Sequence, residues 1–557
     1  MERLLSEFFT AEIAWDADLI EEHGRESGDP SITGLEYDSR KIKPGNIYFA
    51  LPGLHTDGHR FIPNALENGA AVIIHQDEVP EYREGIRYIR VKDSRSAMSP
   101  LSAAFYKNPS RKLTLIGVTG TEGKSTTVYL IYQLLKLSGK KAGFLSTVQY
   151  SDGKTENWNP EHQTTPEATA IHRLLAEMAS NGAEYGVIEA SSHGLSPRTN
   201  RLGDVAFDVA VMTNVTHEHL EFHGTWEQYR EDKANLFRAL DRFDHIKKPA
   251  ESPPPSFGVA NADDPSAGFF AAATKHKTYT YSTRSNTADL SLGLISSGIR
   301  GNWYEVLIRE TGESVDIRDR LPGTFNAGNV LASLLVVSGL LSIPVKDLTP
   351  LVPQLKPVRG RMTAIQKGQP FDVFVDYAHT PSSFETIFPP LRERLDKTGS
   401  DQKSRLISLF GSAGERDTKK RSEQGRIAAQ WSDLIILTDE DPRGENPMDI
   451  LEEIAKGCFA DQGCEVDQGC EVDQGCEADQ GCEADQGCEK CTRGENLYLI
   501  PNRSEAIRKA FSLARPGDMV LLLGKGHENS IIYAKETLAY DEIAEAEKAL
   551  AEMGWNA

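Results

Sequence analysis

The sequence predicts an α/β protein of three domains, with a central P-loop-type domain on a parallel sheet and a C-terminal Rossmann-like domain. Three observations lead to this prediction. The chain has 557 residues, which is too long for one hydrophobic core. Apolar, strand-like runs alternate with helical patterns, as is typical of a parallel sheet wrapped by helices. One such run, Leu113–Ile116, leads into a glycine-rich loop and then a stretch with helical spacing.

The limits of the domains are placed where the pattern changes. Residues 1–110 mix short apolar strands such as "NIYFALPG" with helical stretches and form the predicted N-terminal domain. Residues 111–345 carry the strand-like runs "LTLIGVTG", "YGVIEASS" and "FDVAVMTN" of the central domain. Residues 346–557 show a second alternating pattern, with candidate strands "FDVFVDYA", "RLISLFG", "DLIILTD" and "DMVLLLG". We therefore expect a separate C-terminal domain that binds ligands at the ends of its strands.

Charge and composition exclude several classes of partner. The formal net charge is −21 and no basic patch occurs along the chain, so nucleic acid is not an expected partner. The first residues, "MERLLSEFFTAEIAWDADLIEE", contain acids where a signal peptide needs an apolar core, and no run of 18 apolar residues occurs. We therefore predict a cytoplasmic protein that does not enter a membrane, and we expect a monomer.

All seven cysteines fall within residues 458–491, where the six-residue unit "CEVDQG" and its variants repeat in tandem. The rest of the chain has no disulfide framework, which suits a reducing compartment. The repeat is acidic and poor in large apolar side chains, so it is predicted to be a disordered loop inserted into the C-terminal domain. The alternative interpretation is a metal-binding tract of cysteines and acids.

The stretch "GVTGTEGKSTT", Gly117–Thr127, has the composition of a phosphate-binding loop. Glycines allow backbone N–H groups to approach phosphate oxygens, and the N-terminus of the following helix adds its dipole. Lys124 would neutralise the outer phosphates, and the Ser125 hydroxyl is placed to bind Mg²⁺. The nucleotide-binding residues predicted in this loop are Gly120, Thr121, Glu122, Gly123, Lys124, Ser125 and Thr126.

Two further stretches carry side chains suited to a metal ion. Glu189 in "VIEASSHGL" follows an apolar strand, so its carboxylate would reach a metal near the phosphates. The stretch "NVTHEHLEFHG" supplies His217, His219 and His223 after another strand, which suggests a second metal or phosphate contact. Taken alone, each stretch has a simpler interpretation, namely a solvated acid at a strand end and a group of surface histidines.

A series of motifs occurs in a fixed order along the chain: "GVTGTEGKSTT", "TTPEA", "EASSHGL", "NVTHEHLEFHG", "YREDKANLF", "NADDP", "GTFNAGNVLA", "GRM", "DYAHTP", "GSAGERDTKKR", "EDPRGENP" and "GKGHE". Together they resemble the Mur ligase family, and within it the branch that adds the third amino acid to the peptidoglycan precursor UDP-MurNAc-L-Ala-D-Glu. The resemblance implies an ATP- and Mg²⁺-dependent ligase. Such an enzyme transfers the γ-phosphate of ATP to a substrate carboxylate, and the amine of a diamino acid attacks the resulting acyl phosphate.

The resemblance also implies roles for individual residues. Lys124, Glu189, His219 and Lys233 would be catalytic, and the Mg²⁺ ligands would be Ser125, Glu189, His219 and a carbamylated Lys233. Carbamylation turns the lysine cation into an anion that is able to hold the metal. ATP would bind mainly on the central domain, with further contacts from Asn326, Arg361 and Asp376, the last two brought over by domain closure. The UDP substrate, whose UDP end lies on the N-terminal domain, would contact Ser39, Thr164, Thr165, Ser191 and Arg201, with Arg198 as the alternative arginine.

The incoming amino acid is expected on the C-terminal domain, at Arg416, Glu440, Asp441, Arg443, Gly524 and Glu528. Family members that use meso-diaminopimelate usually carry Asp-Asn-Pro-Arg where this chain has "EDPR". Arg443 favours an amino acid with a second carboxylate, through a bidentate pair. The extra acid Asp441 favours an uncompensated side-chain ammonium, as in lysine or ornithine. The phosphate loop also differs from the family, because Glu122 stands where asparagine is usual.

Other functions stay open at this point. MurF and folylpolyglutamate synthetase are ligases of the same plan, although "DSR…PG…DGH" argues against the folate enzymes and "SSHGL" with "GKGHE" against MurF. A P-loop ATPase that needs no amino acid is the alternative from another class, but it leaves "EDPRGENP" unexplained. A scaffold built around the cysteine tract would lose activity on deletion of residues 458–491, a deletion that we expect to be nearly silent.

Overall fold

The computed structural model of the chain describes residues 2–53, 56–159, 163–216, 220–247, 253–298, 301–321, 323–397, 404–459 and 491–556. It divides into two compact units, Met1–Lys356 and Pro357–Ala557, and each is described by itself. The predicted domain limits at residues 110 and 345 stay predictions. The predicted disordered loop falls almost wholly on residues 460–490, which lie outside the described residues.

The first unit begins with a five-stranded sheet in the order β2-β7-β6-β5-β4, parallel except where β2 pairs with β7. The strands are β2 Leu19–His23, β4 Gly34–Glu36, β5 Asn46–Phe49, β6 Val72–His75 and β7 Arg87–Val91, and the short strands β1 Arg3–Leu4 and β3 Ser31–Ile32 pair separately. The helices are α1 Ala11–Asp16, α2 Ile62–Glu67 and α3 Met98–Phe105. The strands β5 and β6 are buried at every position, as expected for strands covered on both faces.

An eleven-stranded sheet follows in the same unit. Its parallel core is β9 Ala142–Leu145, β12 Tyr185–Glu189, β8 Thr114–Thr119, β13 Val209–Met212, β14 Phe257–Asn261 and β15 Thr278–Ser282. At one edge the antiparallel strands β10 Gln149–Ser151 and β11 Glu156–Trp158 extend it. At the other edge β16 Leu290–Gly298 pairs in parallel with β15, and β17 Gly301–Ile308 and β18 Glu313–Arg318 follow in antiparallel pairs. The predicted parallel sheet is therefore correct for the core. The hairpins were missed because strand–helix alternation carries no sign of them.

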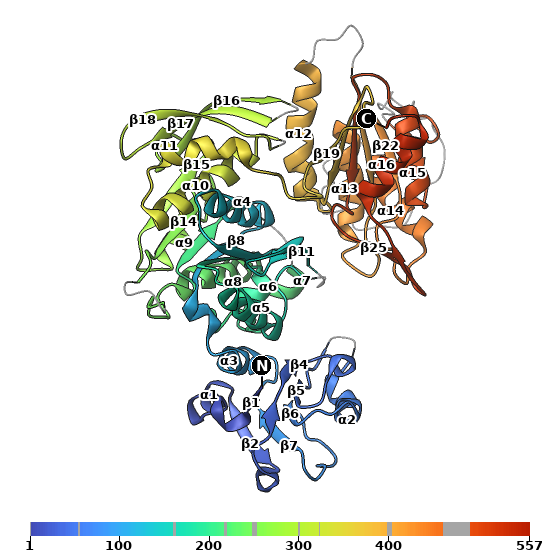
Figure 1. Cartoon of the computed structure of the whole chain (residues 1–557). Helices are drawn as coiled ribbons and strands as arrows, with labels where there is room; N and C mark the ends of the chain where they lie inside the picture. Colours follow the sequence, from blue (N-terminus) through green and yellow to red (C-terminus); the bar gives the residue numbers. More distant parts are fainter. Residues whose placement is uncertain are drawn as a thin grey trace, which may run out of the picture. The chain divides into compact units, whose positions relative to one another are not determined.

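Helices cover both faces of this sheet. They are α4 Lys124–Leu137, α5 Ala168–Ser180, α6 Ser192–Leu195, α7 Leu220–His223, α8 Trp226–Ala239, α9 Ala267–Ala272, α10 Asn326–Leu341 and α11 Val345–Leu348. The central strand β8 faces both layers, because Ile116 packs into the cluster with α4 and α10 while Leu115 packs into the cluster with α5 and α8. Figure 1 shows these two pairs of helices on opposite sides of β8. This layering places the start of α4 at the end of β8.

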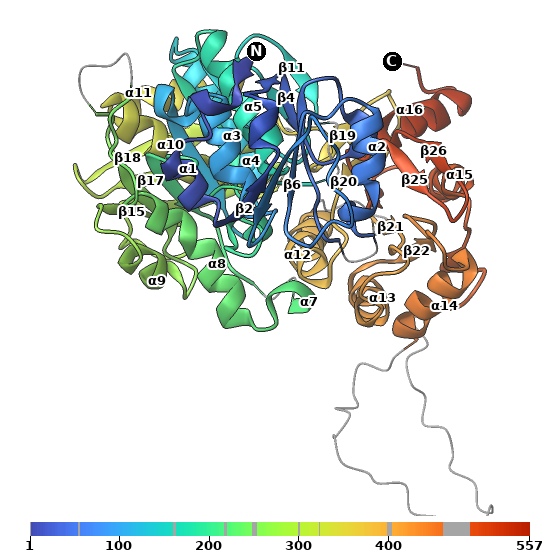
Figure 2. The ribbon, with the colours of Figure 1, turned by 90° about the horizontal axis from the view of Figure 1, so that it is seen from below.

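The second unit holds a six-stranded sheet in the order β19-β20-β24-β21-β22-β23. Its strands are β19 Thr363–Ile365, β20 Asp372–Asp376, β21 Leu406–Phe410, β22 Leu434–Leu437, β23 Leu497–Leu499 and β24 Met519–Leu523, so all four candidate strands are confirmed. Its helices are α12 Pro381–Lys397, α13 Lys419–Trp431, α14 Pro447–Cys458, α15 Arg503–Leu513 and α16 Glu542–Glu552. The hairpin of β25 Ser530–Ile532 and β26 Thr537–Ala539 lies between β24 and α16 in the chain. In Figure 2, α15 and α16 lie on one side of this sheet and α13 and α14 on the other.

A search of the described ranges for membrane-spanning helices finds no single helix that is both long and apolar enough. One pair bent by 111°, Asn326–Leu341 with Val345–Gln354, passes by length and composition alone.

Candidate active site

The phosphate loop runs from the end of β8 at Thr119 to the start of α4 at Lys124. Gly120 and Gly123 both have left-handed backbone angles, with φ of 152° and 82°. A Cβ added at Gly120 would lie 1.9 Å from Thr213 Oγ1, and one at Gly123 would lie 2.6 Å from Asn329 Oδ1. Both positions therefore require glycine, for conformation and for space.

The loop that follows β13 braces the phosphate loop. The N–H of Glu122 donates to Asn214 Oδ1 at 2.8 Å, and the Thr213 hydroxyl donates to the Glu122 carbonyl at 2.6 Å. The N–H of Thr121 donates to the Asn214 carbonyl at 2.8 Å, and that of Thr216 donates to the Thr121 hydroxyl at 3.0 Å. These bonds join "GTEGK" to "NVT", so the sequence stretch predicted to carry histidine ligands begins directly beside the loop.

Two lysines lie at the phosphate loop. Lys124 Nζ donates to the Thr121 carbonyl at 2.6 Å, and Lys233 Nζ donates to the Gly120 carbonyl at 2.5 Å. Lys233 is 1% exposed and lies over the ring of Tyr229, with Nζ 4.4 Å from the ring centre. The family resemblance alone singled out Lys233 in the sequence, and the structure shows its side chain buried at the loop.

Ser125 and Glu189 meet beside this loop. The Ser125 hydroxyl donates to Glu189 Oε2 at 2.9 Å, and the N–H of Thr147 donates to the same oxygen at 2.8 Å. Glu189 ends β12 and is 1% exposed, so the interpretation as a solvated acid is wrong. A hydroxyl and a carboxylate are ligands that Mg²⁺ accepts, and these two residues fit such an ion. His219, the further predicted ligand, lies outside the described residues.

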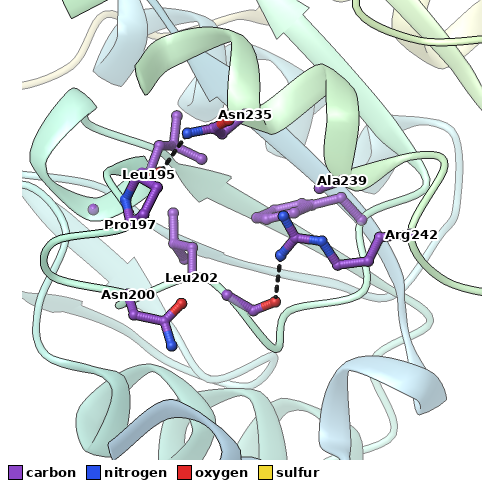
Figure 3. A pocket seen from close by; sticks show the side chains of 10 residues that line it. Leu195, Pro197, Asn200, Leu202, Asn235, Ala239 and Arg242 are labelled. Carbon is purple, nitrogen blue, oxygen red and sulfur yellow. Dashed lines mark hydrogen bonds between the residues drawn. The ribbon is translucent and has the colours of Figure 1, made fainter. Parts of the chain in front are cut away.

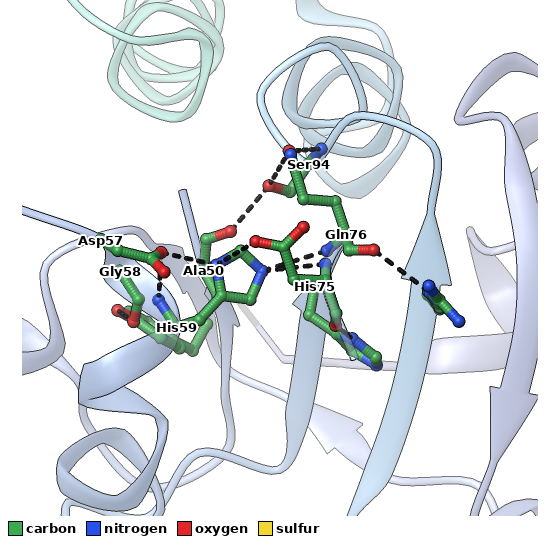
Figure 4. Close-up of polar contacts among 10 residues, drawn as sticks. Ala50, Asp57, Gly58, His59, His75, Gln76 and Ser94 are labelled. Atoms are coloured by element: carbon green, nitrogen blue, oxygen red, sulfur yellow. Dashed lines mark hydrogen bonds and ion pairs between the residues drawn. The ribbon is translucent and has the colours of Figure 1, made fainter. Parts of the chain in front are cut away.

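A second group of metal-ligating side chains is found on the N-terminal sheet. Among the described residues, Asp57, His59 and Asp77 bring their ligand atoms within 4.8 Å of one another. Figure 4 shows Asp57 and His59 of this group. Both imidazole nitrogens are engaged, because His59 Nε2 accepts from the N–H groups of Gln76 and Asp77 at 3.2 and 3.3 Å. His59 Nδ1 then donates to Asp57 Oδ1 at 2.7 Å. The arrangement is thus a hydrogen-bonded brace between two loops.

Three of the predicted substrate contacts gather at the end of β12. The Thr165 hydroxyl donates to the Glu189 carbonyl and accepts from the N–H of Ser191, both at 2.9 Å. Arg201 donates to the Thr165 carbonyl at 2.7 Å and to Glu167 Oε1 at 2.9 Å. Arg198, the alternative arginine, donates instead to the Phe222 carbonyl at 2.8 Å.

The two remaining predicted substrate residues are Thr164, a chain neighbour of this group, and Ser39, at the N-terminal sheet. Thr164 precedes Thr165 in the chain and is partly buried. Ser39 begins the 3₁₀ helix Ser39–Lys41, which packs beside α2 at the N-terminal sheet. The structure therefore does not bring Ser39 into the group at β12.

Asn326 begins α10 and is tied to the phosphate-loop helix by a residue that the sequence analysis missed. Asn329 Nδ2 donates to Asn326 Oδ1 at 2.9 Å, and the Thr127 hydroxyl donates to Asn329 Oδ1 at 3.2 Å. The signal was present in "NAGN", since residues three apart share a helix face. Asn214 was missed as well, although it stands in the quoted motif "NVTHEH".

In the second unit, Arg361 and Asp376 lie close together, as their shared predicted role requires. Asp376 ends β20 and accepts from the N–H groups of Met362 and Ala378, both at 2.7 Å. Arg361 lies over the ring of Tyr377, with its guanidinium carbon 4.8 Å from the ring centre. Burial raises the pKa of Asp376, and the Arg361 cation opposes that shift.

The predicted amino-acid pocket contains a buried lysine that the sequence analysis missed. Lys525 Nζ donates to Asp441 Oδ1 at 2.8 Å and lies 2.6 Å from Glu528 Oε2. The N–H of Ile532 donates to the same Asp441 oxygen at 3.0 Å. The charge of Asp441 therefore has a partner within the chain. Glu440 lies beside Gly524, where an added Cβ would be 3.2 Å from Glu440 Oε2.

The backbone of Arg443 is fixed by a hydrogen bond to a neighbouring strand. Its φ is 54°, and its N–H donates to the Ile532 carbonyl at 2.9 Å. Within the described ranges, its buried Nε has no hydrogen-bond partner, and neither has the buried Glu440 Oε2. Arg416, by contrast, is exposed. Burial raises the pKa of the nearby Asp439 to about 6, while a hydrogen bond from Tyr533 opposes the shift.

The chain matches three family descriptions in order. "Mur ligase family, catalytic domain" matches residues 31–106, "Mur ligase middle domain" matches residues 118–337, and "Mur ligase, glutamate ligase domain" matches residues 360–526. Together they take in the phosphate loop, the group at β12 and the pocket around Lys525.

Named relatives cover nearly the whole chain. The UDP-N-acetylmuramyl-tripeptide synthetase of Treponema denticola is 48% identical over 540 residues, covering 93% of this chain and 94% of that protein. The UDP-N-acetylmuramoyl-L-alanyl-D-glutamate–2,6-diaminopimelate ligase of Caldanaerobacter subterraneus is 32% identical over 527 residues, covering 94% and 96%. A solved ligase of the latter name has a TM-score of 0.55 at 26% identity, covering 94% and 95%. MurF of Thermotoga maritima, solved with ADP, shares the fold with a TM-score of 0.58 at 20% identity, covering 93% and 96%.

Proposed function

The chain belongs to the Mur ligase family, and on that premise we propose that it adds a third residue, a diamino acid, to UDP-MurNAc-L-Ala-D-Glu in an ATP-dependent reaction. The 48% identity to a tripeptide synthetase supports this step of peptidoglycan precursor synthesis. The observation that carries the proposal is the Ser125–Glu189 contact, 2.9 Å long, at a glycine loop that follows a central strand. It sets a hydroxyl and a buried carboxylate where nucleotide phosphates would bind.

The reaction needs two anions to be held together. A carboxylate is a poor electrophile, so the γ-phosphate of ATP would be transferred to it and would later depart as the amide forms. Lys124 and the N–H groups of the phosphate loop would hold the phosphates, and the group at β12 would hold the sugar-peptide. Mg²⁺, when bound by Ser125 and Glu189, would offset the negative charge of the reacting groups.

We propose Lys233 as the carbamylated residue of this site. Its amine already lies at the phosphate loop, bonded to the Gly120 carbonyl at 2.5 Å, and the side chain is 1% exposed. A carbamate there would add an oxygen ligand near Gly120, at the start of the loop, whereas Ser125 follows the end of the loop. His219 is proposed as a further ligand by motif position alone.

The identity of the diamino acid would turn on Arg443. Every candidate carries a side-chain ammonium, which the unpartnered Glu440 Oε2 would suit, whereas meso-diaminopimelate alone adds a second carboxylate. Asp441 already pairs with Lys525, so its charge supports lysine or ornithine less than the sequence alone suggested.

Arg361 and Asp376, in the same unit, are proposed as ATP contacts.

The test is product formation with ATP, Mg²⁺, UDP-MurNAc-L-Ala-D-Glu and one amino acid at a time: meso-diaminopimelate, L-lysine or L-ornithine. We expect phosphate release to require one of them and to match tripeptide formation. An equal rate of phosphate release without any amino acid would identify an ATPase and contradict the proposal.

The Arg443→Met variant makes the assay decisive for specificity. If wild type prefers diaminopimelate, the variant should lose roughly 100-fold in kcat/KM for it, because a bidentate charge pair is removed. If lysine or ornithine is preferred, the variant should change little. Arg426→Met, at an arginine of α13 that pairs with Glu423 outside the predicted pocket, is the matched variant and should change this kcat/KM by less than about twofold.

A further inference from the structure

A buried row of hydrogen bonds joins three helices beside the candidate active site. His223 Nε2 lies 3.0 Å from Ser192 Oγ, and His223 Nδ1 lies 2.7 Å from Asp232 Oδ2. The other oxygen of Asp232 accepts from Gln228 Nε2 at 3.0 Å. Ser192, His223 and Asp232 are 2%, 3% and 2% exposed, and they belong to α6, α7 and α8. We name these three residues the histidine row.

The chemistry of the row fixes its directions. A carboxylate only accepts, so His223 Nδ1 carries a proton and donates to Asp232. In the neutral ring, Nε2 then accepts from the Ser192 hydroxyl. Both ring nitrogens are therefore engaged, and a buried polar chain satisfied in this way holds its members in one arrangement. With 2% of its surface exposed, Ser192 is closed to a substrate, so the row is not a nucleophilic site.

Each end of the row adjoins a residue of the proposed reaction. Ser192 follows Ser191, whose N–H is bonded to Thr165 in the group at β12. Asp232 precedes Lys233, whose amine is bonded to the phosphate loop. On a helix, neighbouring residues point about 100° apart, so α8 directs Asp232 to the row and Lys233 to the loop. The position of α6 relative to α8 therefore sets the position of Ser191 relative to Lys233.

A pocket lies beside the contact between these two helices. A cavity of about 110 Å³ lies against both of them, lined by Leu195 of α6 and by Asn235 and Ala239 of α8 (Figure 3). Beside it, Asn235 Nδ2 donates to the Leu195 carbonyl at 3.1 Å. Hydrogen bonds thus join α6 to α8 beside this pocket, and the histidine row is a buried set of such bonds next to the reacting groups.

We propose that His223 is a positioning residue that couples the substrate side of the site, at Ser191, to the phosphate side, at Lys233. The inference rests on the proposed function for the roles of those two residues. His223 would not touch substrate, and it would act by holding the first turn of α6 against α8.

The first experiment compares two histidine variants in tripeptide formation. His223→Asn should lower kcat/KM for the UDP substrate by about 10- to 100-fold, because small displacements of positioning groups cost that much. His172→Asn, at a histidine of α5 that is buried but outside the site, should change it by less than about twofold. Equal effects of the two variants would reduce His223 to a packing role.

The second experiment tests the coupling without turnover, through the binding of Mg²⁺·ADP measured by calorimetry. Ser192→Ala changes the end of the row far from Lys233, so it should weaken this binding by about threefold through His223 alone. The same change should have no further effect in an Asp232→Ala background, where the acceptor for His223 Nδ1 is gone and the row is already cut.

Two outcomes separate the coupling from the proposed function. Ser192→Ala losses that simply add to those of Asp232→Ala, or no loss at all, would overturn the coupling. A protein that binds Mg²⁺·ADP but makes no tripeptide would contradict the proposed function, whereas the binding cycle would still decide the coupling. Thermal unfolding of each variant checks that the row has been cut in a folded protein.

Discussion

The two candidate sites hold their working groups by different means. In the first unit, the phosphate loop is shaped by glycines and braced by bonds of its backbone, such as those of Glu122 with Thr213 and Asn214. The two lysines at the loop also donate to its backbone carbonyls. In the second unit, the pocket is held by buried charges. Lys525 joins Asp441 to Glu528, and Arg503 joins the Asp439 and Leu523 carbonyls while pairing with Glu542.

This difference decides what each site tolerates. A loop set by backbone conformation is sensitive to a single added methyl group. A pocket set by ion pairs accepts changes of shape at its rim but is destabilised when one partner of a buried pair is removed. The same contrast explains why glycine positions identify the first site in the sequence, whereas the motif "GKGHE", which contains Lys525, does not reveal the ion pairs of that lysine.

The largest expected effect is that of Gly120→Ala in the phosphate loop. The new Cβ would lie 1.9 Å from Thr213 Oγ1 and would require alanine at a φ of 152°, so the loop must shift away from its place at Lys233. We expect kcat/KM for ATP to fall by about 1,000-fold in the tripeptide assay, since the loop positions the phosphates.

Two variants sharpen this prediction. Gly120→Ala combined with Thr213→Ala removes the oxygen in closest conflict and should recover part of the lost activity. Gly139→Ala, at a glycine with φ of 78° and open space around it, should cost about 1 kcal/mol of stability and little activity. Comparable losses of activity at Gly120 and Gly139 would show that the loop is not held by its backbone.

The second effect in size is that of Lys525→Met in the charged pocket. It leaves Asp441 and the largely buried Glu528 without their cation, so we expect unfolding of the protein to be easier by about 3 kcal/mol, measured by denaturant titration. Adding Asp441→Asn should restore part of this loss, because one uncompensated charge is removed. If the Lys525→Met variant were as stable as wild type, buried charges would not hold the second site together.

The sequence predicts most of what is local in both sites. Strand β8, its glycine loop and α4 are contiguous, and the four predicted strands of the second unit are continuous apolar runs that need no knowledge of their partners. The residue types of the phosphate loop follow from phosphate chemistry in the same way. For these elements, tertiary structure agrees with the local pattern.

The features that the sequence does not reveal depend on pairing between distant residues. Lys525 and Asp441 are 84 residues apart, and His223 meets Ser192 across 31 residues. The sequence also does not show whether a lysine on a helix is buried or exposed, and Lys233 is a buried example. The hairpins β10–β11 and β16–β18 were missed for a related reason, because strand–helix alternation says nothing of how edge strands pair.

The smallest predicted effect separates burial from charge by means of two histidines. Burial alone lowers the pKa of His172 in α5 to about 3, and among the described residues neither of its ring nitrogens has a hydrogen-bond partner. In the second unit, the pKa of His527 is also lowered to about 3, by burial first and then by the cations of Arg361 and Lys525. His172 therefore reports burial without the charges that mark the second site.

The sign of the pH effect follows from this lowered pKa. Between pH 6.5 and pH 3 the unfolded chain binds a proton at His172 that the folded chain does not, so the stability of the wild type falls as the pH drops. Relative to wild type, His172→Leu should gain about 1.4 kcal/mol between pH 7.5 and pH 5.5 in denaturant titrations. His245→Gln should move in the opposite direction, because a hydrogen bond to Asp208 raises the pKa of His245 and its contribution is greatest at low pH. If the two differences changed with pH in the same direction, burial would not be the cause of the shift at His172.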